Sequence, residues 1–142
     1  MRQDAYQDLR KNPALIPTTI EEMCRFVSPV THMRRTVAED TQLSGTALKK
    51  GDKLVLWFSS ANRDGSFFDT PDQLVLDRKP NPHIGFGGGA HFCLGAHLAR
   101  YETKLFLEAL TQRISRFELL SEPERLASNW FTGWTSMMVR WS

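Results

Sequence analysis

The first part of the chain alternates apolar and polar positions with a helical period. Residues 4–11 have the spacing of a short amphipathic helix, which the Asn12-Pro13 step should end because a residue before proline is disfavoured in the helical region. A second helix is predicted over 19–27. Thr18 or Thr19, each followed three positions later by a glutamate, is expected to form a capping box at its start.

The longest periodic segment predicts a third helix over 94–115. Its apolar positions fall near one face, and the opposite face is polar, so we expect the apolar face to be buried. That face comprises Leu94, Leu98, Leu105 and Ala109, extended by Leu110 and Ile114.

Between the second and third helices the pattern is typical of short strands and turns. Residues 30–58 predict a small antiparallel sheet with turns at 44–45 and 50–52, ending in a strand over 53–58. Residues 61–83 are rich in turn formers and predict a long functional loop. The tail predicts a short strand from residue 117, a break at Pro123 and a hairpin ending in 137–141. The fold class is therefore mainly α with a small antiparallel β region (α+β).

Composition restricts the class of protein further. With 142 residues, 41% of them hydrophobic, the chain fits one globular domain over 1–142. The net charge of +2 with no basic stripe argues against nucleic acid as a partner. The longest apolar run, 54–58, is far shorter than the roughly 20 residues of a membrane-spanning helix, so we expect no membrane span and a cytoplasmic location.

The two cysteines, Cys24 and Cys93, are too few for a disulfide framework or a cysteine-based zinc site. Cys93 follows a glycine-rich run and precedes the longest predicted helix. The free N–H groups and the dipole at a helix start favour negative charge, here a thiolate. The glycines would let backbone N–H groups approach that sulfur closely. Cys93 is thus the candidate metal ligand, while Cys24 is expected to be a packing residue.

The run from Phe86 to Gly95 has the pattern Phe-x-x-Gly-x-x-x-Cys-x-Gly, through Phe86, Gly89, Cys93 and Gly95. In this the chain resembles the C-terminal portion of the cytochrome P-450 fold, in soluble bacterial members. The resemblance implies haem b (iron protoporphyrin IX) as cofactor, with Cys93 as catalytic thiolate and iron ligand. The cofactor-binding positions that it implies are Arg35, Phe86, Gly87, His91, Cys93, Leu94, Gly95 and Ala99. Arg35 and His91 match positions that bind the haem propionates, and strand alternation predicts that Arg34 faces the other way.

A second motif of that family is Glu-x-x-Arg, found here as Glu22 and Arg25. The resemblance implies that both side chains join Arg78 in a buried network that braces the cysteine loop. It also implies an apolar substrate of the sterol, terpenoid or fatty acid class, and an electron donor that is a ferredoxin or a flavoprotein reductase. The candidate substrate contacts are Val30, Thr31, Met33, Phe131 and Thr132.

The implied activity is monooxygenation, but the family's central helix, with its oxygen-activating acid and alcohol, has no counterpart in the sequence. We therefore expect a fragment, a truncated gene product, or a chain completed by another polypeptide. A non-catalytic haem-binding remnant is the first alternative. A dinucleotide-binding module is the second, because residues 85–90 fit G-x-G-x-x-A, with Glu108 as a ribose partner. The segment before residues 85–90 is no hydrophobic strand, which weighs against that module.

Overall fold

The structure is a computed structural model that describes residues 3–142. Its helices are α1 (Gln3–Lys11), α2 (Ile16–Val27), the short α3 (Phe58–Ala61) and α4 (Ala96–Arg113), with 3-10 turns η1 (Pro13–Leu15) and η2 (Gly89–His91). Its strands are β1 (His32–Thr36), β2 (Thr41–Leu43), β3 (Thr46–Leu48), β4 (Lys53–Trp57), β5 (Phe117–Leu119), β6 (Glu124–Arg125), β7 (Trp134–Ser136) and β8 (Val139–Trp141). The predicted class, helices with small antiparallel sheets, is confirmed.

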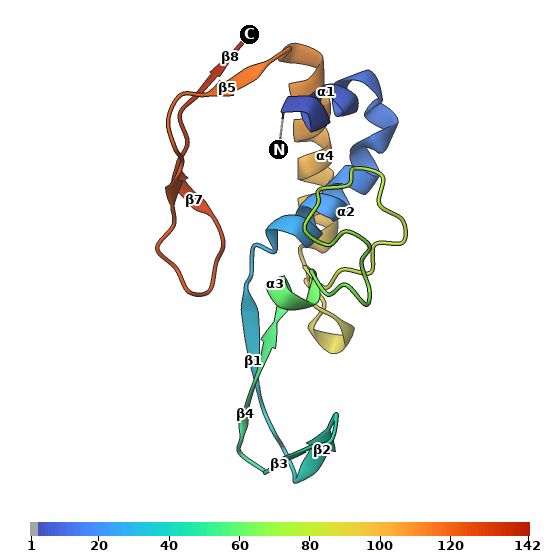
Figure 1. Ribbon diagram of the computed structural model, residues 1–142, viewed down its shortest axis with the longest axis vertical. Coiled ribbons are helices and arrows are strands. Elements are labelled where there is room, and N and C mark those ends of the chain that lie inside the picture. Colours follow the sequence, from blue (N-terminus) through green and yellow to red (C-terminus); the bar gives the residue numbers. More distant parts are fainter. Residues whose placement is uncertain (1–2) are drawn as a thin grey trace.

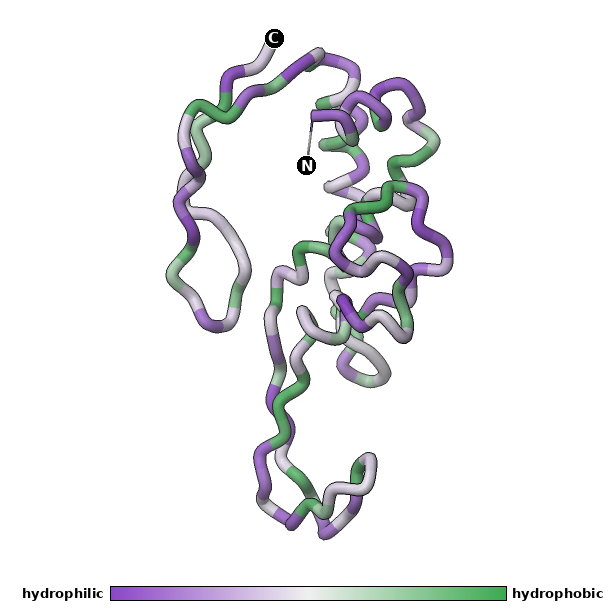
Figure 2. The backbone as a smooth tube through the Cα atoms, viewed as in Figure 1, coloured by the Kyte–Doolittle hydropathy of each residue, from purple (hydrophilic) through white to green (hydrophobic). Residues whose placement is uncertain are grey.

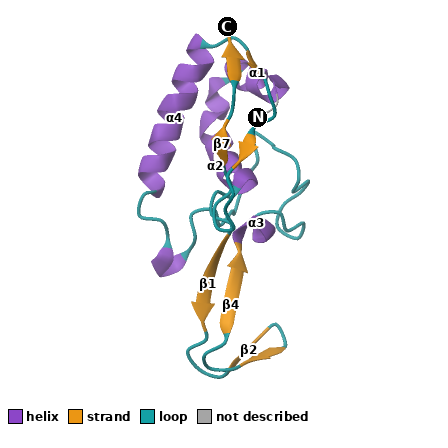
Figure 3. Ribbon diagram, turned by 90° about the vertical axis from the view of Figure 1, so that its left-hand side faces the viewer, coloured by secondary structure: helices purple, strands orange, loops and turns teal. Residues whose placement is uncertain are grey.

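Helices α1, α2 and α4 pack together and form the compact part of the molecule (Figures 1 and 3). Their shared core consists of Leu9, Ile16, Ile20 and Leu107, one or two from each helix. Burying four such side chains contributes roughly 1.5–3 kcal/mol each, which makes this cluster the main apolar anchor of the helical part.

Helix α1 also closes the C-terminal end of α4. The Tyr6 hydroxyl lies within hydrogen-bond distance of the Leu110 and Ile114 carbonyl oxygens, at 3.0 and 2.8 Å. The Gln7 amide donates to the Ser115 carbonyl at 2.7 Å. The last carbonyls of a helix have no partner within it, so donors from α1 satisfy groups that would otherwise need water.

The start of α2 differs from the prediction. The helix begins at Ile16 rather than residue 19, and no side chain caps it. Thr18 Oγ1 donates backwards to the Leu15 carbonyl at 3.0 Å, so the predicted capping box is wrong. The turn η1 runs directly into α2, and Pro17 in the first turn has no N–H that needs a partner.

The buried face of α4 is not the predicted one. Leu94, Leu98 and Leu105 are 101%, 60% and 47% exposed, whereas Ala96 and Leu107 are buried. The periodicity correctly indicated a helix. The buried positions of α4, however, are Ala96, Leu107 and Thr111, not the predicted row of leucines. Contacts with partners distant in sequence decide which face is covered.

The described strands form four separate two-stranded antiparallel sheets. Two of these lie in residues 30–58, where the sequence predicted a single small sheet. β1 pairs with β4, and this ribbon extends away from the helices and carries the β2–β3 hairpin at its far end (Figure 1). The predicted turns at 44–45 and 50–52 are confirmed. In the tail, β5 pairs with β8 and β6 with β7, so the C-terminal segment is one long nested hairpin.

The molecule exposes a large surface for its size. Its accessible area is 10123 Å², whereas a folded monomer of its mass exposes roughly 7,500 Å². Figure 2 shows hydrophobic positions along the extended arms as well as among the helices. Exposed large apolar side chains lie on α4, on β4 and in the C-terminal tail over residues 117–142.

Candidate functional site

The cysteine lies in a tight loop directly before α4. The Cys93 N–H donates to the Phe86 carbonyl at 2.8 Å, and the Cys93 carbonyl accepts from the Ala96 N–H at 3.2 Å. The first bond closes the glycine loop on itself, and the second joins it to the start of α4. Cys93 is exposed, so its sulfur is accessible for ligation.

Two glycines are required for the path of this loop. Gly87 has a φ of +73°, and a β-carbon there would lie 3.1 Å from the His91 carbonyl oxygen. At Gly85 a β-carbon would lie 3.0 Å from the Cys24 carbonyl oxygen and 3.2 Å from His83 Nδ1. The loop therefore packs closely against α2, and larger residues would displace it.

A pocket of about 690 Å³ opens beside the cysteine. Cys93 and His91 from the cysteine loop and Arg35 from β1 line it. The other lining residues contribute backbone or mostly apolar side chains. They are Cys24, Pro29, Val30, Met33, Leu56, Phe58, Ile84, Gly85, Phe86, Gly87 and Gly88. Met33 and Arg35 alternate along β1 with Arg34, which does not line the pocket, as strand geometry predicts.

The predicted substrate-contact positions lie together, on two segments that are far apart in sequence. Val30 and Phe131 form an antiparallel bridge. The Thr31 N–H donates to the Trp130 carbonyl at 2.9 Å, and the Thr132 N–H donates to the Pro29 carbonyl at 2.8 Å. Val30 and Met33 line the pocket, whereas Thr31, Phe131 and Thr132 flank it.

Three predicted cofactor positions lie outside the pocket lining. Leu94 is fully exposed, and Gly95 is the N-cap residue of α4. Ala99 is half-buried and donates its N–H to the Gly95 carbonyl at 2.9 Å. These positions form the first turn of α4 and the step into it, directly after the cysteine.

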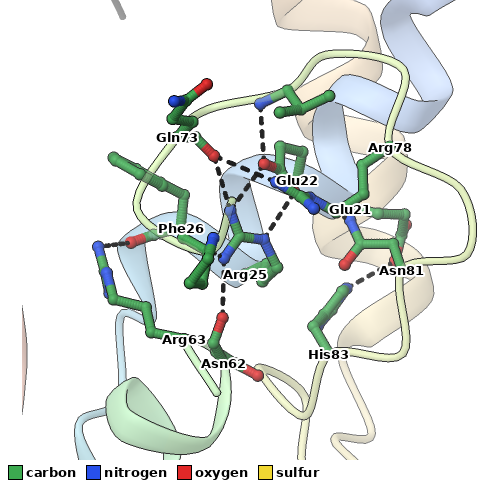
Figure 4. A network of polar contacts seen from close by, with 12 residues as sticks. Glu21, Glu22, Arg25, Phe26, Asn62, Arg63, Gln73, Arg78, Asn81 and His83 are labelled. Atoms are coloured by element: carbon green, nitrogen blue, oxygen red, sulfur yellow. Dashed lines mark hydrogen bonds and ion pairs between the residues drawn. The ribbon is translucent and has the colours of Figure 1, made fainter. Parts of the chain in front are cut away.

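The structure brings Glu22, Arg25 and Arg78 together in a buried network (Figure 4). Glu22 accepts from Arg25 Nε and Nη2 at 2.8 Å each, and from Arg78 Nε at 3.0 Å. The Val75 N–H and the Asn81 side-chain amide complete its contacts, at 2.9 and 3.2 Å. Burial raises the pKa of Glu22, but these hydrogen bonds outweigh burial and lower the pKa overall.

The two arginines also bind the backbone of the long loop over residues 61–83. Arg25 donates to main-chain carbonyls at 2.8–2.9 Å, and Arg78 donates to others at 2.6–3.3 Å. The accepting carbonyls belong to Asn62, Asp69, Thr70, Pro71 and Gln73. Residues 62–83 contain no helix or strand, so these charged donors supply the partners that the buried carbonyls of the loop need.

Sequence reasoning missed a second ionic cluster next to the first. Glu21 accepts from Arg100 Nε at 2.6 Å and from Arg100 Nη2 at 2.8 Å, and it contacts His83 Nε2 at 3.0 Å. The hydrogen bond from Arg100 lowers the pKa of Glu21, with a smaller contribution from His83, against the effect of burial. The sequence signals for this cluster were weak, because the two partners of Glu21 lie 62 and 79 positions away from it in sequence. The adjacent glutamates Glu21 and Glu22 were the one feature that could have pointed to it.

The other candidate sites are the second cysteine, a second cavity and clusters of metal-ligating side chains. Burial raises the pKa of the Cys24 thiol to about 11, which fits the predicted packing role. A larger cavity of about 1140 Å³ lies between α1, α2 and residues 72–77, and it contains neither cysteine. Over residues 3–142, no group of three or more His, Cys, Asp or Glu side chains could hold a metal ion. None of the helices described is long and apolar enough to cross a membrane.

The dinucleotide-binding alternative does not fit the fold. That motif needs a parallel strand before the glycines and another after the helix. Within the described chain every strand pairing is antiparallel, and a loop precedes Gly85. Glu108 lies beside Lys104 at 3.8 Å on α4, with no parallel sheet near it.

Comparison with known proteins agrees with the geometry. The cytochrome P450 family profile matches residues 1–138. Linalool 8-monooxygenase from Pseudomonas putida is 44% identical over 136 residues, which are 96% of this chain and 34% of that protein. A methyl-branched lipid omega-hydroxylase from Mycobacterium bovis is 48% identical over 129 residues, 90% of this chain and 30% of that protein.

Solved structures show the same correspondence. A cytochrome P450 from Novosphingobium aromaticivorans superposes with a TM-score of 0.93 at 38% identity, covering 98% of this chain and 35% of that one. A Bacillus megaterium structure, CYP109E1 in complex with testosterone, gives 0.91 at 38% identity, with 96% and 38% covered. The chain spans about a third of the length of the curated relatives that it matches. Because this similarity extends over nearly the whole length of the chain, the chain belongs to the cytochrome P450 family.

Proposed function

We propose that this chain forms the haem-thiolate side of a P450 monooxygenase, with Cys93 as the iron ligand. The observation that carries the proposal is the position of Cys93, at a pocket that is otherwise largely apolar and is also lined by Arg35 and His91. Haem is the cofactor that the family implies.

The residues present fit that cofactor. Haem is a flat apolar ring with two carboxylates at its edge and an iron that needs an axial ligand. The pocket offers apolar walls, a thiol, and two nitrogen donors in Arg35 and His91. Arginine offers a planar fork suited to a carboxylate, and histidine offers an N–H. Leu94 and Gly95 directly before α4, Ala99 at the start of α4, and the loop residues Phe86 and Gly87 would complete the contacts on the thiolate side.

Bound haem would supply the activation of dioxygen, with one oxygen atom inserted into the substrate and the other reduced to water. This chain's own residues would hold and shield that chemistry. Cys93 would provide a negatively charged ligand, Met33 and Val30 would exclude water, and the segment around Phe131 would bound the substrate. The electrons would come from a ferredoxin or a flavoprotein reductase.

An apolar, lipid-like molecule is the proposed substrate class. The relatives carry names of enzymes that act on linalool, methyl-branched lipids and steroids, which supports a terpenoid, fatty acid or sterol. The lining is in keeping with this class, because Val30, Met33 and Leu56 offer no charged group for a polar substrate.

The ligand assignment is tested by reconstitution. The protein is mixed with haem, reduced and exposed to carbon monoxide. Thiolate ligation gives a strongly red-shifted Soret band, which Cys93→Ser should lose and Cys24→Ser should keep. Cys24 is the matched control because it lines the same pocket but its thiol is half-buried and its pKa is raised. Identical spectra for the two variants would show that the assignment is wrong.

A non-catalytic haem-binding role is the second candidate. The described residues that line the pocket offer a thiol and nitrogen donors for haem, but they include no carboxylic acid or alcohol that could deliver a proton to bound oxygen. An open haem would autoxidise and leak peroxide instead of oxidising a substrate. Supplying reductase, reducing nucleotide and a panel of sterols, terpenes and fatty acids separates the two candidates. Product equal to reductant consumed indicates a monooxygenase, and reductant consumed without product indicates a binding role.

A further inference from the structure

Glu21 contacts two side chains whose residues precede and follow the cysteine loop in the sequence. One is Arg100 on α4, which meets the carboxylate through Nε and Nη2 at 2.6 and 2.8 Å. The other is His83, whose Nε2 lies 3.0 Å from the same carboxylate. His83 is 4% exposed, and the Glu21 and Arg100 side chains are 31% and 30% exposed. A two-pronged arginine contact of this kind fixes orientation as well as distance.

Both partners of Glu21 also contact the cysteine loop, His83 through the Gly85 N–H and Arg100 through the Phe86 ring. His83 Nδ1 accepts the Gly85 N–H at 3.1 Å, so its other ring nitrogen carries the hydrogen that faces Glu21. The Arg100 guanidinium lies 4.5 Å from the centre of the Phe86 ring, a cation–π distance. The Phe86 carbonyl in turn accepts the Cys93 N–H at 2.8 Å. A single carboxylate is thus connected to Gly85 on one side and to Cys93 on the other.

We propose that Glu21 is a positioning residue for the iron ligand, holding His83 and Arg100 so that residues 85 and 86 fix the conformation of the Cys93 backbone. This inference rests on the proposed function, because it concerns the same ligand. It assigns Glu21 a task different from that of its neighbour Glu22. Glu22 holds the loop over residues 61–83 through Arg25 and Arg78, whereas Glu21 holds the turn that directly contacts the cysteine.

The geometry supports a local effect rather than a global one. The Glu21 contacts are part-buried, and Glu21, His83 and Arg100 are not members of the apolar core cluster of Leu9, Ile16, Ile20 and Leu107. Losing them should free the turn at residues 83–86 while the packing of α1 against α4 stays intact. Glu21 is therefore separable from residues that only stabilise the fold, by a measurement made residue by residue.

The experiment measures amide hydrogen exchange in the haem-free protein for Glu21→Gln, with Glu102→Gln as control. Glu102 is exposed on the same helix as Arg100, and the change removes the same charge. We expect Glu21→Gln to speed exchange of the Gly85 and Cys93 amides about tenfold while core amides of α1 and α4 change less than about twofold. Arg100→Lys keeps the charge but loses the fork, so it should give an intermediate increase.

The haem-loaded protein gives the second readout. The fraction of the carbon monoxide complex with the red-shifted Soret band should fall in Glu21→Gln and stay unchanged in Glu102→Gln. Equal exchange at Gly85 and Cys93 in both variants would overturn the positioning role, as would faster exchange spread evenly over the whole chain. Absence of the red-shifted band in the unmodified protein would instead overturn the proposed function, and the haem-free exchange data would still decide whether Glu21 fixes the loop.

Discussion

Replacing Glu22 with alanine would remove the acceptor at the centre of the buried network. The carboxylate receives five hydrogen bonds: from Arg25 Nε and Nη2, from the Val75 N–H, from Arg78 Nε and from the Asn81 amide. Both arginines would keep their backbone partners. They would nevertheless lose the negative charge that compensates their burial, at 0% and 7% side-chain exposure.

The expected loss of unfolding free energy is about 3–5 kcal/mol, the usual cost of leaving a buried charge without its partner. The hydrogen bonds to charged groups would give a larger sum at about 1.5–3 kcal/mol each. Such terms do not add, because the remaining carbonyl contacts and entering water recover part of the loss. A loss of only a few tenths of a kcal/mol would mean that the site relaxes at almost no cost.

Urea unfolding followed by far-UV circular dichroism measures this loss, and a double-mutant cycle with Arg25→Met isolates the pair. We expect a coupling of about 1–3 kcal/mol between positions 22 and 25. The exposed pair Glu118 and Arg140, 3.8 Å apart, is the control and should give about 0–1 kcal/mol. Coupling near zero at the buried pair would refute the idea that it acts as one unit.

Three further outcomes are expected. Gly85→Ala should cost roughly 1–3 kcal/mol in thermal melts, because its β-carbon would lie 3.0 Å from the Cys24 carbonyl, whereas Gly88→Ala, with open space within 4 Å, should cost less. The folded-state pKa of Glu22 is lowered, so its contribution to stability is present above the ordinary pKa of about 4.3 and is lost as pH falls through the lower folded-state pKa. Urea titrations from neutral to acid pH should therefore show a smaller loss of stability with falling pH in Glu22→Gln than in the unmodified protein. Tyr6→Phe should cost about 1–3 kcal/mol by urea unfolding, since α4 loses a donor at its end, and an unchanged midpoint would contradict this.

The sequence predicted the local features well because they depend on neighbouring residues. The three main helices, the turns at 44–45 and 50–52 and the fold class follow from periodicity and turn formers. The start of α2 at Ile16 was missed because η1 precedes it, and a short 3-10 turn has no strong pattern in the sequence.

Long-range features were predicted less well. The leucine stripe of α4 was expected inside, but a pattern cannot tell which of two faces meets α1 and α2. The sequence also did not show that β1–β4 and β2–β3 form separate sheets, because strand pairing depends on contacts between residues that are far apart in sequence. At the site, the grouping of Glu22, Arg25 and Arg78 came from resemblance to a family. The contact of Glu21 with Arg100 had no such guide.

The arginine contacts of the loop over residues 61–83 have a consequence for sequence variation. Arg25 and Arg78 bind main-chain oxygens, and every residue type provides a main-chain oxygen. Side chains at positions such as Asp69, Thr70 and Gln73 are therefore not what holds the loop in place. The loop can accept many substitutions at its exposed positions while its path stays the same, provided that the two arginines, Glu22 and the loop's own Asn62, Phe68 and Asn81 are kept, because Asn62 and Phe68 are buried and Asn81 donates to Glu22. Tolerance to mutation should thus be wide at the exposed positions of the loop and narrow at its buried positions and at Glu22 and Arg25.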